Sequence, residues 1–544
     1  MMTASRRPWR AWTLAVASVA CVAHGACAPA RGTRVAEPVS FDLIIAGGTV
    51  IDGSGAPGYR ADVAIAGDRI ALISRQPIAP ARARRNIDAT GLVVSPGFID
   101  LHAHIEPLLR MPDAESHVRQ GVTTAVGGPD GGGPWPFARY LDSAQTLGVG
   151  MNVAFLVGHN TIRRNVMQLD NRAPTPAELE QMRGMVAQGM HEGAFGLSTG
   201  LRYLPGTFSN TDEVVALTQV AKDSGGIYTS HLREEGLGVI EGVAEAIEIG
   251  RRTGITIVLT HHKVIGKPMW GQSVRTLAMV DSARTAGVDV RIDQYPYTAT
   301  STGIGVLVPT WALAGGDSAF ERRVADPALR DSIVRGIVQL LMTDRGGGDL
   351  ARVQFARVSW QPTLEGRTLH DWAVERGLPS TAETGAQLVI EATQRGGASA
   401  IYHVLDEGDV ERIMRHPQTM IASDGRLSRP REGHPHPRAY GTFPRVLGRY
   451  VRERQVLTLE DAIKKMTSMP AATLRLTDRG RLVPGARADL TIFNADSVSD
   501  GATFQDPHQY PSGIPYVIVN GTLAVDGGRF TTARAGRVLR RGRE

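Results

Sequence analysis

Cysteine is nearly absent from this chain, which has only Cys21 and Cys27 among its 544 residues. Both lie in the first thirty residues, which we interpret below as a removable leader. The chain beyond that leader therefore has no disulfide bond and no thiolate metal ligand. Any metal site in it must be built from His, Asp and Glu.

A basic surface of the kind that binds nucleic acid is also missing. The formal net charge is +6, but the excess of basic residues falls at the two ends, in SRRPWR and ARAGRVLRRGRE. Charges of both signs are mixed between these ends, which excludes nucleic-acid binding as the expected function. The composition is that of an ordinary globular protein, and the length predicts one large domain with appendages or two to three domains.

Residues 1–30 have the features of a signal peptide: a basic start, an apolar stretch and small residues where a peptidase would cut. The stretch is too short and too rich in alanine for a permanent membrane span. We therefore expect export to the periplasm or the exterior, without a transmembrane segment. SRRPWR loosely resembles a twin-arginine signal, and the small residue before Cys21 and before Cys27 leaves open a lipid anchor on either one.

Short alternating apolar stretches, broken by Gly-Gly and Asp-Gly, occur near both ends of the chain and predict antiparallel strands. Their similarity predicts that residues 40–96 and 476–535 form the two halves of one small β-sandwich. Residues 536–544 would follow as a basic tail.

The middle of the chain, residues 97–475, alternates apolar strand-like runs with helical segments, which indicates an α/β fold with parallel strands. Eight runs predict a (β/α)8 TIM barrel. Thr175, Pro176 and Glu178 supply an N-cap, a first-turn proline and a capping-box Glu for one helix. The long interval between the last two runs predicts an inserted subdomain at about residues 300–415. The runs are GFIDLHAH, TTAVGG, NVAFLVGH, AFGLST, GIYTSH, TIVLTHHK, DVRIDQYPY and TMIASDG.

Chemistry in such a barrel gathers at the C-terminal ends of the strands, and the first run ends in His102 and His104. Side chains alternate along a strand, so the two rings point to the same side and can reach one metal ion. Two structural histidines are the alternative. The pairing directly after an apolar run favours metal ligands.

Other runs end in comparable side chains. His231 ends the fifth run and His261 the sixth, where we prefer His261 to His262 because it continues the inward side of the strand. Each alone would equally suit a structural role. Asp424 ends the eighth run and Asp130 follows the second, and a plain turn is the alternative for both. A carboxylate at Asp424 could take a proton from a metal-activated water and pass it to a leaving group.

Arg233 and Lys263 stand two residues after His231 and His261. They are either ordinary surface charges or, beside a metal, a binding site for a substrate carboxylate, which arginine holds through two hydrogen bonds. Tyr203, after the fourth run, either adds a hydroxyl to that site or packs as a loop aromatic.

These residues, in this order, resemble the amidohydrolase superfamily and more closely its D-aminoacylase (N-acyl-D-amino-acid deacylase) branch. The superfamily resemblance lies in PGFIDLHAH, the strand-end histidines and SDG. The closer resemblance spans about residues 40–530 and lies in QGVTTAVGG, GLSTGLRYLPG, TSHLREEG, LTHHK and HPHPRAYGTFPRVLGRYVRE. It implies a zinc-dependent hydrolase, with one or two metal ions, that cleaves N-acyl-D-amino acids.

The resemblance also implies roles for individual residues. Its metal ligands would be His102, His104, His231, His261 and Asp424, with Asp424 also the general acid and base, and Tyr203, Arg233 and Lys263 would hold the substrate carboxylate. The best-known D-aminoacylases have a bridging cysteine where this chain has Asp130. A carboxylate can also bridge two metals, but loss of the thiolate is expected to shift the preference from Zn²⁺ toward Mn²⁺ or Co²⁺.

Two other interpretations stay open. A cyclic-amide hydrolase of the dihydroorotase or hydantoinase type, or a dipeptidase, would use the same cluster on a different small-molecule substrate. A non-catalytic exported binding protein on this scaffold would be marked by lost ligands, and here every expected ligand position is occupied.

Overall fold

The structure is a computed structural model that describes residues 40–542. The predicted signal peptide, including Cys21 and Cys27, lies outside the described residues, as do residues 543 and 544. Within residues 40–542, no helix has both the length and the apolar character that a membrane crossing requires.

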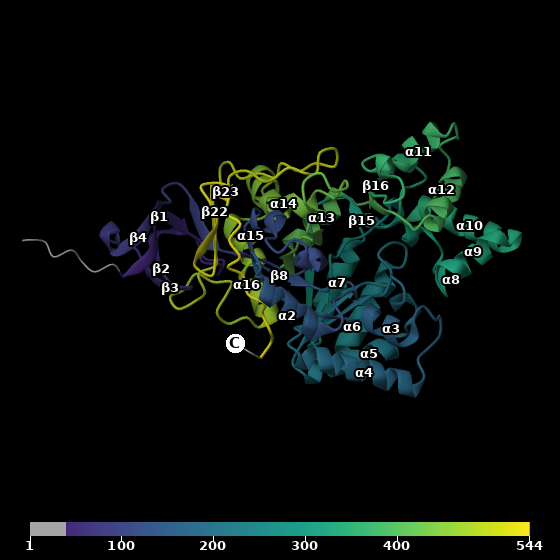
Figure 1. Cartoon of the computed structure of the whole chain (residues 1–544), viewed down its shortest axis with the longest axis horizontal. Coiled ribbons are helices and arrows are strands. Elements are labelled where there is room, and N and C mark those ends of the chain that lie inside the picture. The colour runs from purple at the N-terminus through teal and green to yellow at the C-terminus, as the bar shows by residue number, and fades with distance from the viewer. Residues whose placement is uncertain (1–39, 543–544) are drawn as a thin grey trace, which may run out of the picture. The chain divides into compact units, whose positions relative to one another are not determined.

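One sheet takes its strands from both ends of the chain, drawn as purple and yellow ribbons in Figure 1. Its order is β23-β22-β21-β20-β5-β1-β2-β3, with β4 paired to β1. The two ends join where β20 pairs antiparallel with β5, with Leu490 opposite Pro96. The strands are β1 (Phe41–Val50), β2 (Tyr59–Ala66), β3 (Arg69–Ser74), β4 (Ala83–Asp88), β5 (Val93–Pro96), β20 (Leu490–Phe493), β21 (Tyr516–Val519), β22 (Thr522–Asp526) and β23 (Arg529–Phe530).

Hydrogen bonds connect all nine strands into this one sheet, and its packing as a β-sandwich stays a prediction. The register of β1 shifts between Ile45 and Gly48. Residues 41–46 pair with β4, whereas Thr49 and Val50 pair with β5. β1 therefore connects β4 with β5. Apolar side chains from both chain ends share one core.

The eight predicted runs all form parallel strands. They belong to sheets of order β10-β11-β12-β13-β14-β18, β6-β8-β9 and β19-β7. Within one run β9 continues into β10, and in the eighth run β19 follows β18 and pairs with β7, with Gly425 opposite Ala103. The bounds are β6 (Phe98–Asp100), β7 (Ala103–His104), β8 (Val122–Gly127), β9 (Asn152–Phe155), β10 (Val157–Gly158), β11 (Gly196–Gly200), β12 (Ile227–His231), β13 (Ile257–Leu259), β14 (Val290–Gln294), β18 (Thr419–Ile421) and β19 (Gly425–Arg426).

Helices separate most of these strands, and the predicted capping box is confirmed. The Thr175 hydroxyl accepts from the Glu178 N–H at 3.3 Å, while the Glu178 carboxylate accepts from the Thr175 N–H at 2.8 Å. The helices are α1 (Glu115–Val118), α2 (Phe137–Leu147), α3 (His159–Met167), α4 (Pro176–His191), α5 (Thr211–Asp223), α6 (Val239–Thr253), α7 (Ser273–Thr285), α13 (Glu407–Arg415), α14 (Arg438–Arg445), α15 (Leu459–Met466) and α16 (Ser468–Leu474). A π-helix, η8 (Val446–Glu453), continues α14, and 3-10 turns are η1 (Pro80–Arg82), η2 (Glu106–Leu109), η3 (Gly206–Phe208) and η4 (Lys267–Met269).

Between β14 and β18 the chain forms an antiparallel sheet of order β15-β17-β16, with helices and an apolar core of its own. The ribbon of these elements is teal to green in Figure 1. They are β15 (Thr300–Gly303), η5 (Ile304–Leu307), α8 (Thr310–Leu313), α9 (Asp317–Ala325), α10 (Pro327–Thr343), η6 (Leu350–Arg352), β16 (Val353–Arg357), η7 (Pro362–Leu364), α11 (Leu369–Glu375), α12 (Ala382–Gln394) and β17 (Ser399–Tyr402).

The described part of the predicted basic tail packs against β9. The Val153 N–H donates to the Arg537 carbonyl at 2.9 Å, and the Leu539 N–H donates to the Val153 carbonyl at 2.8 Å. Val538 and Leu539 are buried, so apolar residues between the arginines attach this segment to the fold.

Candidate metal centre

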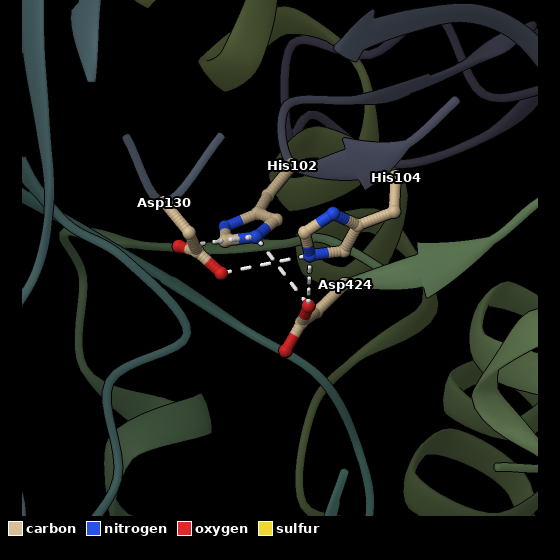
Figure 2. Close-up of side chains that lie close together, drawn as sticks. All are labelled: His102, His104, Asp130 and Asp424. Carbon is tan, nitrogen blue, oxygen red and sulfur yellow. Dashed lines mark ion pairs between the residues drawn. The ribbon is translucent and has the colours of Figure 1, made fainter. Parts of the chain in front are cut away.

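Four side chains from three distant parts of the chain meet beside β7, as Figure 2 shows. His102 and His104 come from the first run, Asp130 follows β8, and Asp424 lies between β18 and β19. The Nε2 atom of His102 lies 3.6 Å from an Asp130 oxygen and 3.4 Å from an Asp424 oxygen. For His104 Nε2 the corresponding distances are 3.5 and 3.2 Å. Both rings thus face the same two carboxylates.

A second group shares Asp130. It contains His231 at the end of β12 and His261 just after β13. His231 Nδ1 and His261 Nε2 lie 2.7 Å apart, at 3.7 and 3.4 Å from the two Asp130 oxygens. The structure therefore places two adjacent sets of ligand atoms around one shared carboxylate, as a centre for two cations requires.

The donor set fits divalent metal ions. Imidazole and carboxylate ligands suit zinc, and carboxylates also suit manganese. In addition, both ring nitrogens of His102 and one oxygen of Asp130 are buried, and no described residue forms a hydrogen bond with them. Buried polar atoms rarely lack a partner, so a cation at this position would satisfy them.

The backbone is unusual at the ligands themselves. Asp130, His261 and Asp424 have φ angles of 54°, 38° and 48°, in the left-handed region that residues other than glycine seldom adopt. Such strain persists only where the surroundings enforce it, and it concentrates at functional sites. At these three residues the chain turns immediately after a strand, which directs each side chain toward the shared centre.

Electrostatics keep both carboxylates ionised. Burial by itself would raise the pKa of Asp130, but His102 and His261 outweigh burial and hold that pKa well below its usual range. The pKa of Asp424 is likewise held far down, against burial, by Arg438 and His102. Burial would lower the pKa of His102, yet the two carboxylates raise it to about 10. A metal ion would displace such histidine protons on binding.

Glu235 orients the second pair of histidines, a role that the sequence interpretation missed. Its carboxylate lies 3.5 Å from His231 Nε2 and 3.3 Å from His261 Nδ1, and it accepts a hydrogen bond from Lys263 at 2.6 Å. Contacts of this kind select the ring nitrogen that faces a metal. They leave His231 Nδ1 and His261 Nε2 directed at Asp130. The only signal in the sequence was an acidic residue four positions after His231.

Two further buried carboxylates hold the backbone around the ligands. Asp293, at the end region of β14, accepts the His261 N–H at 2.5 Å. Asp100 in β6 accepts the Ser423 N–H at 2.9 Å, immediately before Asp424. Both residues end apolar strand runs, but nothing in the sequence distinguishes a carboxylate that binds the backbone from one that binds a metal.

The three residues predicted to hold the substrate occupy different surroundings. Tyr203 lies with its ring centroid 4.4 Å from that of His231, and Lys263 donates to Glu235; both line the central cavity. The guanidinium of Arg233 instead pairs with Glu245, at 2.8 Å from each carboxylate oxygen. Arg233 is not among the residues that line the cavity, and its binding of a substrate carboxylate stays a prediction.

The cavity has a volume of about 880 Å³ and is lined by members of both ligand groups. Two lining residues that the sequence interpretation did not assign are Tyr295 and Arg438. Arg438 lies 2.6 Å from an Asp424 oxygen, and its guanidinium stands 4.7 Å from the Tyr295 ring. Lys263 Nζ is 5.8 Å from the same ring, and the buried Tyr295 hydroxyl has no hydrogen-bond partner within the described part of the chain. Two cations and a free hydroxyl thus surround one part of the cavity.

Comparison with known proteins agrees with this geometry. The model of the family described as "Amidohydrolase family" matches residues 85–525. The N-acyl-D-glutamate deacylase of Alcaligenes xylosoxydans xylosoxydans is 39% identical over 527 residues, which is 92% of this chain and 97% of that relative. A solved D-aminoacylase with a binuclear metal centre is 37% identical, with a TM-score of 0.78 over 92% of this chain and all of the other.

A second solved structure is the N-acyl-D-glutamate deacylase of Bordetella bronchiseptica, complexed with zinc and a phosphonate inhibitor that mimics the tetrahedral intermediate. It is 35% identical, with the same TM-score of 0.78 and the same coverage of both chains. From the family match, these similarities and the two ligand groups, we conclude that the chain belongs to the amidohydrolase family, as a metal-dependent member similar to D-aminoacylase.

Proposed function

We propose that this protein hydrolyses the amide bond of N-acyl-D-amino acids, giving a carboxylate and a free D-amino acid. The observation that carries the proposal is the pair of ligand groups around Asp130, in one cavity with Lys263, Tyr295 and Arg438. A metal centre would activate water for attack on an amide, and the neighbouring Lys and Arg side chains would bind a substrate carboxylate.

The metal ions would occupy two positions. His102, His104, Asp130 and Asp424 would hold one, and Asp130, His231 and His261 the other. Bound there, a divalent cation polarises a carbonyl and lowers the pKa of a water molecule. Zn²⁺ is the expected ion. The exchange of a thiolate for the harder Asp130 carboxylate supports Mn²⁺ or Co²⁺ as alternatives.

Asp424 is placed to move the proton. One of its oxygens faces His102 and His104, and the other pairs with Arg438. Its low pKa means that it starts ionised. It would accept a proton from the attacking water and then donate it to the amine nitrogen as the C–N bond breaks, so that no proton is left on the protein after turnover.

The substrate carboxylate would bind between Lys263 and Arg438. Both side chains approach the ring of Tyr295, whose buried hydroxyl is unpartnered and available as a donor. Arginine binds carboxylates through two parallel hydrogen bonds, which fixes the α-carbon relative to the metal centre and provides a basis for selection of the D isomer. Tyr203 beside His231 would border the acyl carbonyl.

The test is a substrate panel run with metal-depleted and metal-reloaded enzyme. N-acetyl-D-amino acids, their L isomers, dihydroorotate, hydantoin and dipeptides are compared by kcat/KM. Preference for the D isomers, restored on metal addition, supports the proposal. Preference for cyclic amides or dipeptides would assign the protein to those classes instead, and binding without turnover of any compound would favour a binding protein.

We further infer that the parallel strands close into one (β/α)8 barrel. The pairing of β19 with β7 and the continuity of β9 with β10 support closure, and the segment between β14 and β18 would be the inserted subdomain. Export to the periplasm remains our proposal for residues 1–30, with or without a lipid anchor. Cell fractionation and mass determination of the mature N-terminus would test it.

A further inference from the structure

Arg345 is a buried cation to which residues 40–542 supply no counter-ion within ion-pair distance. It follows α10, lines the cavity and is only 3% exposed. Its Nη1 donates to the Thr300 hydroxyl at 3.2 Å, and its guanidinium stands 5.3 Å from the Tyr402 ring. Its Nε is buried and forms no hydrogen bond with any residue that the structure describes. No carboxylate among residues 40–542 lies within ion-pair distance of it, although burial of an unpaired charge is costly.

Two nearby acidic side chains, Glu234 and Asp344, form no ion pair with Arg345 among the contacts of residues 40–542. Glu234, which influences Arg345 electrostatically, is bound by Arg202 at 3.0 Å. Asp344 precedes Arg345 but turns its carboxylate against Gly236. The arginine therefore faces the cavity with donors that the described residues leave free. The natural complement of such a group is an anion supplied by the ligand.

The contacts of β15 place Arg345 on the substrate side of the cavity. Thr300 and Thr302 are two positions apart, so their side chains project from the same face of the strand. Thr302 donates to the Tyr203 hydroxyl at 3.1 Å, and Tyr203 lies against His231. One face of β15 therefore contacts both Arg345 and a residue beside the metal centre, while Lys263 and Arg438 are already assigned to the α-carboxylate.

We propose that the substrate is dicarboxylic: besides its α-carboxylate it carries a second carboxylate, which binds Arg345. This inference rests on the proposed deacylase function and narrows its substrate class. The second carboxylate belongs either to the amino-acid side chain or to the acyl group. In both cases a neutral amide isostere leaves the buried arginine unpaired, and such sites discriminate strongly against the neutral compound.

The experiment compares two isosteric pairs by kcat/KM. The first pair is N-acetyl-D-glutamate and N-acetyl-D-glutamine, and the second is N-succinyl-D-methionine and its succinamoyl counterpart. We expect the charged member of one pair to be preferred by about 100-fold, and that pair identifies where the second carboxylate lies. Equal rates within both pairs would refute the proposal while leaving the deacylase function intact. Absence of turnover for every N-acyl-D-amino acid would overturn the deacylase function and this inference together.

Substitution of Arg345 tests whether this residue causes the preference for the charged compound. Arg345→Met retains the apolar stem and should abolish the preference, lowering kcat/KM for the charged compound about 100-fold and for its isostere by less than about 3-fold. Arg335→Met, at an exposed position of α10, is the matched control. It should leave kcat/KM unchanged for both the charged compound and its isostere. If Arg345→Met lowers kcat/KM equally for the charged compound and its isostere, the arginine is structural and the proposal fails. Arg345→Lys, with the charge retained, covers the case in which the methionine variant does not fold.

Discussion

Replacement of Asp130 by asparagine tests the metal centre most directly. Among the described residues, Asp130 alone belongs to both ligand groups, and its oxygens lie 3.4 to 3.7 Å from nitrogens of four histidines. Asparagine keeps the size of the side chain but removes its charge and one of its acceptor oxygens. Both cation positions should therefore weaken together.

The expected size follows from the contacts. Loss of a group that merely orients a ligand costs about 10–100-fold in metal affinity, and Asp130 is in direct reach of both cations. We expect the affinity for the tighter ion to fall at least about 100-fold, or about 2.8 kcal/mol, and the second ion to be lost. Titration calorimetry of metal-depleted protein with Zn²⁺, and metal analysis after dialysis, measure both effects.

The control is Asp409→Asn, which alters a buried carboxylate bound to the Gly271 N–H at 2.7 Å and to Ser273, and it should leave metal affinity unchanged. Asp130→Cys should recover binding with a greater preference for Zn²⁺ over Mn²⁺ than the native chain has. If Asp130→Asn retains two ions at native affinity, Asp130 is not the shared ligand and the turn interpretation is correct.

Three further predictions concern other positions. Asp424→Asn should lower kcat by about 10²–10⁴-fold while the ion at His231 and His261 is retained; native kcat in a metal-loaded variant would contradict the proton-transfer role. Glu235→Gln should weaken metal binding by about 10–100-fold in calorimetric titration, and an equal loss in Glu234→Gln would show that the effect is not specific. Burial lowers the pKa of Lys465 from 10.5 to about 8, so between these values the unfolded chain binds more protons, and this group's contribution to stability rises with pH. The Tm of the native protein relative to Lys465→Met should therefore increase from pH 8 to 10, and a constant difference would refute the shift.

The structure places Arg233 and Arg438 in different surroundings. The guanidinium of Arg233, which the sequence predicts to bind the substrate carboxylate, pairs with Glu245 on α6, and that role stays a prediction. Arg438, nearly 180 residues from the sixth run, lies beside Asp424 instead. The direction of a loop side chain depends on its partners in space, which spacing along the chain does not reveal.

The sequence by itself determined the strand runs and the ligand candidates. Period-two alternation placed His102 and His104 on one side, and the rule that parallel strands end at one edge brought Asp130, His231, His261 and Asp424 together. These inferences succeed because they depend on local geometry and on a repeated architecture. A turn residue such as Asp130 could be placed at the right edge even though its chemistry differs from the expected cysteine.

Only the tertiary structure decided which charges are paired. Glu235 contacts two of the histidines, no carboxylate among residues 40–542 forms an ion pair with Arg345, and both facts depend on elements that meet only after folding. The same holds for the nine-stranded sheet, where the pairing of β20 with β5 joins strands from both chain ends. Whether a buried charge binds the protein or awaits a ligand is a property of its neighbours in space, because pairing energies act over a few ångströms and not along the chain.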